Sequence, residues 1–348
     1  MSKKKAIIAM SGGVDSAVAA LLLKDKYDLT GITMQLWSDE RNLPSDNCIE
    51  AKKIADMLDF PHVSVSLEKD FENDVVKAFI EEYRKGKTPN PCVECNKKLK
   101  FGKLFEIAQQ MSIPFLATGH YANIVKDLNG EYRLKKAADS SKDQSYFLWS
   151  IKKERLPYII FPLGDYKKSE IRNIALSNGF SNASRSDSQD ICFIPDGDYT
   201  SFIEKYDGAI TSTGCFIDMS GNVLGQHQGI ERYTIGQRKG LGIALGTPMF
   251  VGRKSAVDNT VTLCSDRELY QTTLTANSIN LLTDHSFEKP TRLEAKIRYR
   301  HTPAIATVER IGEDRLSVIF DIPQRAISPG QSLVLYDEDT VIGGGIIE

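Results

Sequence analysis

Residues 5–22, KAIIAMSGGVDSAVAALL, contain the strand, turn and helix that decide the fold. Lys5–Ala9 is a short apolar run of the kind that forms a buried strand. The apolar residues after the turn repeat at the spacing of one helix face: Val14, Ala17, Val18, Leu21 and Leu22. Two glycines flanked by serines lie between them, so backbone N–H groups and hydroxyls converge at the positive end of a helix dipole. The stretch therefore predicts an anion site, with pyrophosphate as the ligand.

The turn has neither the Walker pattern G-x-x-x-x-G-K-[ST] nor the dinucleotide pattern G-x-G-x-x-G. Residues 11–16, SGGVDS, instead resemble the signature of the PP-loop ATP pyrophosphatases, which split ATP into AMP and pyrophosphate and adenylate a substrate oxygen. The resemblance implies ATP and Mg²⁺, with Asp15 as a catalytic candidate that helps to hold the metal. The implied nucleotide-binding residues are Ala9, Met10, Ser11, Gly12, Gly13, Val14, Asp15 and Ser16. The plain alternative is a glycine-rich turn that binds nothing.

Composition narrows the class of protein. The 348 residues are 41% hydrophobic and 26% charged, which is typical of a soluble globular chain of two or three domains. No apolar run has the length of a membrane span, and the basic N-terminus leads directly into a strand, so we expect a cytoplasmic protein. Its six cysteines are then catalytic, metal-binding or simply buried rather than structural disulfides. A net charge of −2 argues against a general nucleic-acid binder but allows a local basic surface.

Strands and helices alternate through the first part of the chain. Strands are expected at 29–37, 62–67 and 114–118, and helices at 97–111 and 169–177, with further helices at Cys48–Leu58, Phe71–Tyr83 and from Lys142 onward. This alternation predicts an α/β fold with a doubly wound parallel sheet, whose ligands bind beyond the carboxyl ends of the strands. From about residue 206 short β-type runs take over. We expect domains at 1–205, 206–271 and 272–348, the last two β-rich.

The cysteines supply a second signal. Cys92 and Cys95 form a C-x-x-C in a proline-rich loop just before an expected helix, where a thiol is more often ionised. Lys97 and Lys98 add positive charge nearby. Cys192 lies far away in the sequence, also in a polar loop. For each of these cysteines the alternative is a small buried residue.

The order of motifs over nearly the whole chain resembles the tRNA-specific 2-thiouridylase (MnmA) family. The matching stretches are 11–16 SGGVDS, 88–91 TPNP with Cys95-Asn96, 117–122 ATGHYA, 142–148 KDQSYFL, 188–194 SQDICFI, 233–240 YTIGQRKG and 297–300 IRYR. The resemblance implies a PP-loop domain, a small central domain and a C-terminal β-barrel. It also implies that ATP and a protein persulfide replace O2 of the wobble uridine in certain tRNAs with sulfur.

The same resemblance assigns roles to residues. Met34 and Gly119 would line the adenosine, Cys95 would be the nucleophile and Cys192 the persulfide carrier. Cys95 would either resolve the remaining sulfur link, leaving a Cys95–Cys192 disulfide that is reduced in each turnover, or release sulfide. The residues implied to contact RNA are Asn90, Pro91, Cys92, His120, Lys142, Asp143, Gln144, Arg298, Tyr299 and Gln331. The implied partners are tRNAs for Lys, Glu and Gln and a cysteine desulfurase or sulfur-relay protein, with no membrane.

One residue departs from the family pattern, because many members carry aspartate where this chain has Cys92. Cys92, Cys95 and Cys192 could then hold a [4Fe–4S] cluster with one iron open to sulfide, so a cluster-dependent thiolation is an alternative. Another alternative is an amide-forming PP-loop synthetase, which needs ammonia rather than thiols. A third is a module that binds nucleotide or RNA without catalysis.

Overall fold

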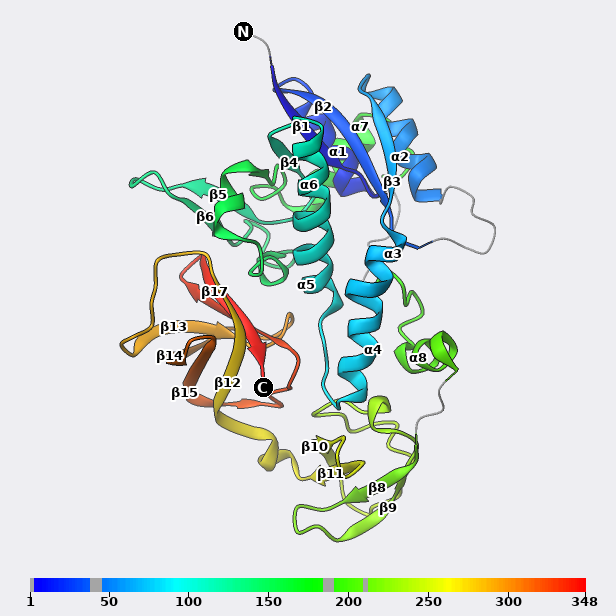
Figure 1. The fold of residues 1–348 in the computed structure, drawn as a ribbon, viewed down its shortest axis with the longest axis vertical. Helices are drawn as coiled ribbons and strands as arrows, with labels where there is room; N and C mark the ends of the chain where they lie inside the picture. The colour runs from blue at the N-terminus through cyan, green and yellow to red at the C-terminus, as the bar shows by residue number, and fades with distance from the viewer. Residues whose placement is uncertain (1–2, 38–45, 184–190, 209–211) are drawn as a thin grey trace. The chain divides into compact units, whose positions relative to one another are not determined.

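The computed structural model describes residues 3–37, 46–183, 191–208 and 212–348 (Figure 1). The chain divides into two units. The first comprises Met1–Val75, Cys92–Gln189 and Glu338–Ile342, and the second Val76–Pro91, Asp190–Asp337 and Gly343–Glu348. Among the described residues, no helix combines the length and apolarity that a membrane crossing requires.

The first unit is built on a parallel sheet of five strands in the order β3-β2-β1-β4-β7. The strands are β1 (Lys4–Ala9), β2 (Tyr27–Gln35), β3 (His62–Ser66), β4 (Phe115–Ala117) and β7 (Ile159–Ile160). Ile8 of β1 pairs with Gly31 of β2 on one side and Ala117 of β4 on the other. The chain leaves β1 toward β2 and β3, then returns to β4, so the strand order reverses between β1 and β4. In open α/β sheets, that reversal point is where ligands bind.

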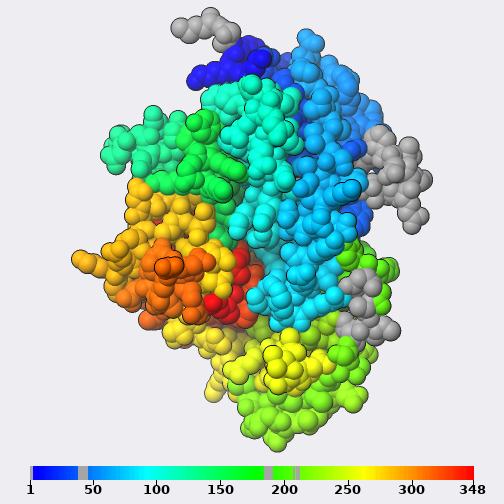
Figure 2. Space-filling view, in the orientation of Figure 1, coloured from blue at the N-terminus to red at the C-terminus, as the bar shows by residue number. Residues whose placement is uncertain are grey.

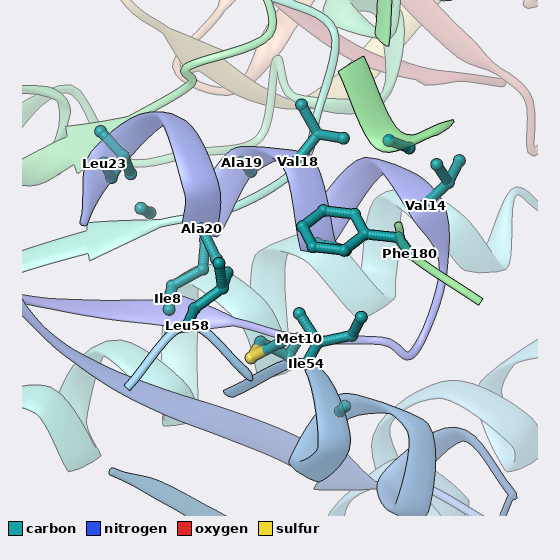
Figure 3. Packing of buried hydrophobic residues seen from close by; sticks show 14 of the residues in the cluster. Ile8, Met10, Val14, Val18, Ala19, Ala20, Leu23, Ile54, Leu58 and Phe180 are labelled. Atoms are coloured by element: carbon teal, nitrogen blue, oxygen red, sulfur yellow. The ribbon is translucent and has the colours of Figure 1, made fainter. Parts of the chain in front are cut away.

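Helices cover the sheet on both faces, as the alternation predicted. Three of the helices of this unit are α1 (Val14–Leu23), α2 (Asp46–Met57) and α7 (Lys168–Ser177). The unit also contains the 3₁₀ turns η3 (Ser145–Phe147) and η4 (Lys153–Tyr158). Ile8 of β1, Met10 just after it, Val14 and Val18 of α1 and Ile54 of α2 belong to one buried hydrophobic cluster (Figure 3). Burying one apolar side chain of the size of valine or isoleucine contributes about 1.5–3 kcal/mol to the stability of the folded state. This core fixes the end of β1 against the start of α1.

Two helical stretches contain π-helical segments. One runs through α3 (Glu68–Phe71), η1 (Glu72–Val76) and α4 (Lys77–Arg84), and the other through α5 (Pro91–Cys95), η2 (Asn96–Lys103) and α6 (Leu104–Gln110). The surface of α6, coloured cyan to teal, covers the sheet on the viewer's side (Figures 1 and 2). The predicted loop position of Cys92 and Cys95 is wrong, because the helix begins at Pro91 rather than near residue 97. Proline suits a first helical position, since its missing N–H would have no partner there.

Two further local predictions have clear outcomes. Asn129-Gly130 forms the predicted hairpin between β5 (Asn123–Lys126) and β6 (Tyr132–Lys135), with Gly130 at φ +85°. The helix expected from Lys142 is only the 3₁₀ turn η3. The carboxylate of Asp143 accepts hydrogen bonds from the backbone N–H and the hydroxyl of Ser145, which favours a turn over a continuing helix.

The second unit contains two β structures. Its central sheet has the order β10-β11-β8-β9, and its core includes Phe216, Tyr233 and Val261. The elements are α8 (Tyr199–Asp207), β8 (Gly214–Ile217), β9 (Val223–His227), η5 (Ile230–Arg232), β10 (Phe250–Ser255), β11 (Thr260–Cys264) and η6 (Asp266–Leu269).

The C-terminal strands form a closed barrel of antiparallel strands, which confirms the predicted barrel. They are β12 (Tyr270–Leu281), β13 (Thr291–Lys296), β14 (Ala304–Gly312), β15 (Arg315–Arg325), β16 (Ser332–Asp337) and β17 (Thr340–Ile347). The order runs β12-β15-β14-β13-β16-β17, and pairing of Ala276 with Ile347 returns the sheet to β12. Leu316, Val318 and Phe320 alternate inward along β15.

Candidate active site

The turn after β1 has the geometry of an anion cradle. Ser11, Gly12 and Gly13 join β1 to α1, and the Ser16 hydroxyl donates to the Gly13 carbonyl at 3.0 Å. The backbone N–H of Ser11 donates to the Ser16 hydroxyl oxygen at 3.2 Å. Ser11 is exposed, whereas the Met10 and Val14 side chains lie in the core. Met10 and Val14 can therefore meet a nucleotide only through their backbones.

Gly12 cannot be replaced by a larger residue without moving the turn. Its φ is +72°, and an added Cβ would lie 2.6 Å from the carbonyl oxygen of Asn47. The Asn182 side-chain amide donates to the Gly12 carbonyl at 2.9 Å. Asn182 is 6% exposed, and among the described residues its Oδ1 has no hydrogen-bond partner. A buried amide therefore fixes the turn from 170 residues further along the chain.

The ends of β1 and β4 meet at Gly119. A Cβ on Gly119 would lie 2.9 Å from both the carbonyl carbon of Asp15 and the backbone nitrogen of Ser16. Only glycine allows this approach, which places the segment after β4 against the first turn of α1. Met34, the other residue implied to line the adenosine, is half-buried near the end of β2.

Asp15 is held by two residues to which the sequence analysis gave no role. Both of its carboxylate oxygens accept hydrogen bonds from the Lys168 ammonium, at 2.7 and 2.8 Å. The Tyr121 hydroxyl donates to one of these oxygens at 2.8 Å. Lys168 and Tyr121 lie 153 and 106 residues from Asp15. Tyr121 belongs to the motif 117–122, but that motif does not reveal its contact with Asp15.

The cysteines differ in exposure. Cys92 is exposed and Cys95 is buried, both on α5 in the first unit, while Cys192 is exposed in the second unit. The π-helical segment η2 begins directly after Cys95, and such segments are frequent at functional sites. Ser188, Gln189 and Asp190 of the Cys192 motif lie outside the described residues.

Several residues implied to contact RNA have structural partners in the first unit. His120 is buried, and its Nδ1 lies 2.7 Å from the Thr118 hydroxyl. Burial, with a smaller effect of the Lys100 ammonium, holds the pKa of His120 well below its ordinary value. Asp143 is buried, and the Gln144 side-chain oxygen accepts from the backbone N–H of Tyr121 at 2.9 Å. Lys142 is half-exposed.

The remaining implied RNA residues lie mostly in the second unit. Arg298 lines a groove of about 640 Å³ together with Arg300 and His301. The Lys296 ammonium lies 5.5 Å from the centre of the Tyr299 ring.

The Gln331 side chain also has a partner in this unit, because its amide donates to the Thr88 carbonyl at 2.7 Å. Gln331 thus fastens the segment that leads to Asn90 and Pro91. Asn90 is half-exposed, while Pro91 is buried at the start of α5.

Comparison with known proteins agrees with this geometry. A family model described as the tRNA methyl transferase HUP domain matches residues 4–196. A second, described as the tRNA methyl transferase PRC-barrel domain, matches residues 200–265. An aminomethyltransferase beta-barrel domain model matches residues 271–347. The tRNA-specific 2-thiouridylase MnmA of Clostridioides difficile is 45% identical over 354 residues, covering 99% of this chain and 98% of that protein.

The chain belongs to the MnmA family. The MnmA protein of Acetivibrio thermocellus is 45% identical and covers 100% of both chains. That of Lachnoclostridium phytofermentans is 42% identical and covers 99% of each. The family membership confirms the resemblance seen in the motifs and supports ATP as a ligand of the PP-loop.

Membership of the MnmA family does not favour the cluster-dependent alternative. Membership of the MnmA family likewise favours thiolation over an amide-forming synthetase or a non-catalytic module.

Proposed function

We propose that this protein is a tRNA-uridine 2-sulfurtransferase that thiolates the wobble uridine, U34, in an ATP-dependent reaction. The observation that carries the proposal is the pyrophosphate turn Ser11–Ser16 within a chain that matches curated MnmA proteins from end to end. In this proposal, the domain of residues 1–205 carries out adenylation and thiolation. The small domain of residues 206–271 connects it to the domain of residues 272–348, which contacts tRNA.

The first step is activation of a poor leaving group. Uridine O2 attacks the α-phosphorus of ATP, and the bond between this phosphorus and the bridging oxygen breaks, so that pyrophosphate leaves. The N–H groups at the start of α1 and the hydroxyls of Ser11 and Ser16 stabilise the charge that develops on pyrophosphate. Met34 and Gly119 line the adenosine.

One residue beside the pyrophosphate turn, Asp15, is suited to bind Mg²⁺. The Asp15 carboxylate is a hard oxygen donor of the type Mg²⁺ prefers, and its side chain is 33% exposed. When bound, the metal would neutralise phosphate charge.

The second step is delivery of sulfur. Cys192 carries a persulfide, whose terminal sulfur attacks C2 of the adenylated uridine and displaces AMP. The Cys95 thiolate then attacks the Cys192 sulfur, which leaves thiouridine and a Cys95–Cys192 disulfide that an external thiol must reduce. The exposure of Cys192 supports this assignment because a sulfur donor protein has to reach it, while the burial of Cys95 suits a thiol that acts after delivery.

The substrate and partners follow from the same reaction. We propose tRNAs for Lys, Glu and Gln as substrates and a cysteine desulfurase or relay protein as the sulfur source, in the cytoplasm. Asn90, Pro91 and Cys92 would surround the target base, and Arg298 and Tyr299 would contact the RNA backbone and a base. An unpaired base can be held by polar edges and a stacked ring.

The test separates adenylation from thiolation. Purified protein is incubated with tRNA, ATP and a persulfide donor, and pyrophosphate and thiouridine are both measured. Cys95→Ser and Cys192→Ser are expected to abolish thiouridine and to retain tRNA-dependent pyrophosphate release. Cys215→Ser, at a half-exposed thiol without a proposed role, is the matched control and should keep both. Normal thiouridine formation by either of the first two variants would contradict the proposal.

A further inference from the structure

Lys168 is a buried cation beside the pyrophosphate turn. It is the first residue of α7, which packs beside α1 (Figure 1). Its side chain is 10% exposed, and its ammonium contacts both oxygens of Asp15 and lies 5.7 Å from the centre of the Tyr121 ring. The backbone N–H of Lys168 donates to the Asp139 carboxylate at 3.0 Å, which fixes the base of this side chain.

Stability alone does not explain the Lys168–Asp15 pair. A buried ion pair costs desolvation energy that its attraction often only offsets, and apolar side chains of similar size would do as well. Function gives a reason, because a bare Asp15 carboxylate in the first turn of α1 would repel any polyanion entering the turn. The positive charge of the Lys168 ammonium cancels the negative charge of the Asp15 carboxylate, so the pair does not repel an incoming polyanion.

We infer that Lys168 is the residue that binds and stabilises the departing pyrophosphate, and that Asp15 holds its ammonium in place until the nucleotide arrives. A Walker loop carries its phosphate-binding lysine within the motif, whereas Ser11–Ser16 contains no basic residue. A lysine ammonium on a flexible four-carbon stem can turn from one carboxylate to a neighbouring phosphate without movement of the helix that carries it.

The inference rests on the proposed use of ATP and adds a residue to that reaction. When uridine O2 forms its bond to the α-phosphorus, the electron pair of the broken bond stays on the bridging oxygen of pyrophosphate. Lys168 meets this charge, and the uridine N3 proton passes to solvent. Lys168 thus acts as an electrostatic stabiliser of this charge rather than as an acid.

The test measures binding of pyrophosphate and of AMP to the full chain by calorimetry, in the presence of Mg²⁺. Lys168→Met is expected to weaken pyrophosphate binding about 10- to 100-fold, the effect of one charge-assisted hydrogen bond, and to leave AMP binding within about twofold. Lys168→Arg keeps the charge and should retain most of the pyrophosphate affinity. Lys167→Met is the matched control, since it removes an exposed positive charge from the adjacent position.

Equal pyrophosphate affinity in wild type and Lys168→Met would overturn the inference, as would an equal loss of pyrophosphate and AMP binding. If Lys168→Met does not fold, a structure of the wild type with pyrophosphate decides: the ammonium nitrogen should lie about 3 Å from a phosphate oxygen. An ammonium that stays on Asp15 and away from the phosphate refutes it. The binding experiment contains no tRNA. A separate failure to thiolate tRNA would therefore count against the proposed function but would leave the conclusion about Lys168 unchanged.

Discussion

Gly12→Ala and Gly179→Ala form a matched pair that isolates the steric requirement of the pyrophosphate turn. The two glycines have almost the same backbone conformation, with φ of +72° and +71°. Alanine in this left-handed region costs about 1–2 kcal/mol at either position. An added Cβ at Gly179 meets nothing within 4 Å, whereas at Gly12 it would lie 2.6 Å from the Asn47 carbonyl oxygen.

The difference in unfolding free energy between the two variants should therefore measure only the clash of the added Cβ with the Asn47 carbonyl oxygen. Forcing extra volume into a packed site costs about 1–3 kcal/mol, so Gly12→Ala should lower the free energy of unfolding by that much more than Gly179→Ala. Since the turn must shift, Gly12→Ala should also weaken pyrophosphate binding at least tenfold, roughly 1.4 kcal/mol. Gly179→Ala should leave binding within about twofold.

Tryptophan fluorescence during urea denaturation is a suitable assay. The chain contains 2 tryptophans, and both Trp37 and Trp149 belong to the first unit, so the signal reports the unit that holds the turn. Calorimetry gives the affinity for pyrophosphate. Equal destabilisation by the two variants, together with unchanged pyrophosphate binding in Gly12→Ala, would refute the reasoning.

Three other predictions concern single residues. Asn182→Ala removes the donor to the Gly12 carbonyl and should cost about 1–3 kcal/mol of stability and weaken pyrophosphate binding; calorimetry that finds the wild-type affinity would contradict this. Gln331→Ala releases the Thr88 carbonyl and should raise the KM for tRNA while pyrophosphate affinity stays constant; an unchanged KM in steady-state thiolation would count against it. Burial lowers the pKa of Lys254 from 10.5 to about 8, so between these values the unfolded chain holds one more proton and the free energy of unfolding rises with pH. Lys254→Met should lose this rise between pH 8 and 10 in urea titrations, and identical pH slopes for the variant and the wild type would show the account to be wrong.

The local part of the site could be predicted from sequence because its signal is local. Residues 5–22 contain a strand, a turn and a helix whose apolar spacing and paired glycines are sufficient by themselves. The alternation of strands and helices then predicted a parallel sheet with helices on both faces, but not the order of its strands. The start of α5 at Pro91 was also open to prediction, since proline favours a first helical position, but the density of prolines in 86–96 favoured a loop.

The partners of the turn could not be predicted in the same way. Lys168, Tyr121 and Asn182 reach Asp15 or Gly12 only through tertiary packing, over separations of 153, 106 and 170 residues. Lys168 and Asn182 are common residue types in ordinary local contexts, and the motif that contains Tyr121 does not show which residue its hydroxyl contacts. Only the placement of α7 beside α1 and of the segment after β4 against Asp15 reveals what they contact.

Mass spectrometry of tRNA nucleosides tests the central claim most directly. Cells that lack this protein are compared with the same cells carrying the wild type or Cys95→Ser. We expect that the 2-thio group at the wobble uridine disappears without the protein, returns with the wild type and stays absent with Cys95→Ser. Wild-type levels of 2-thiouridine in the deletion cells, or full restoration by Cys95→Ser, would contradict it.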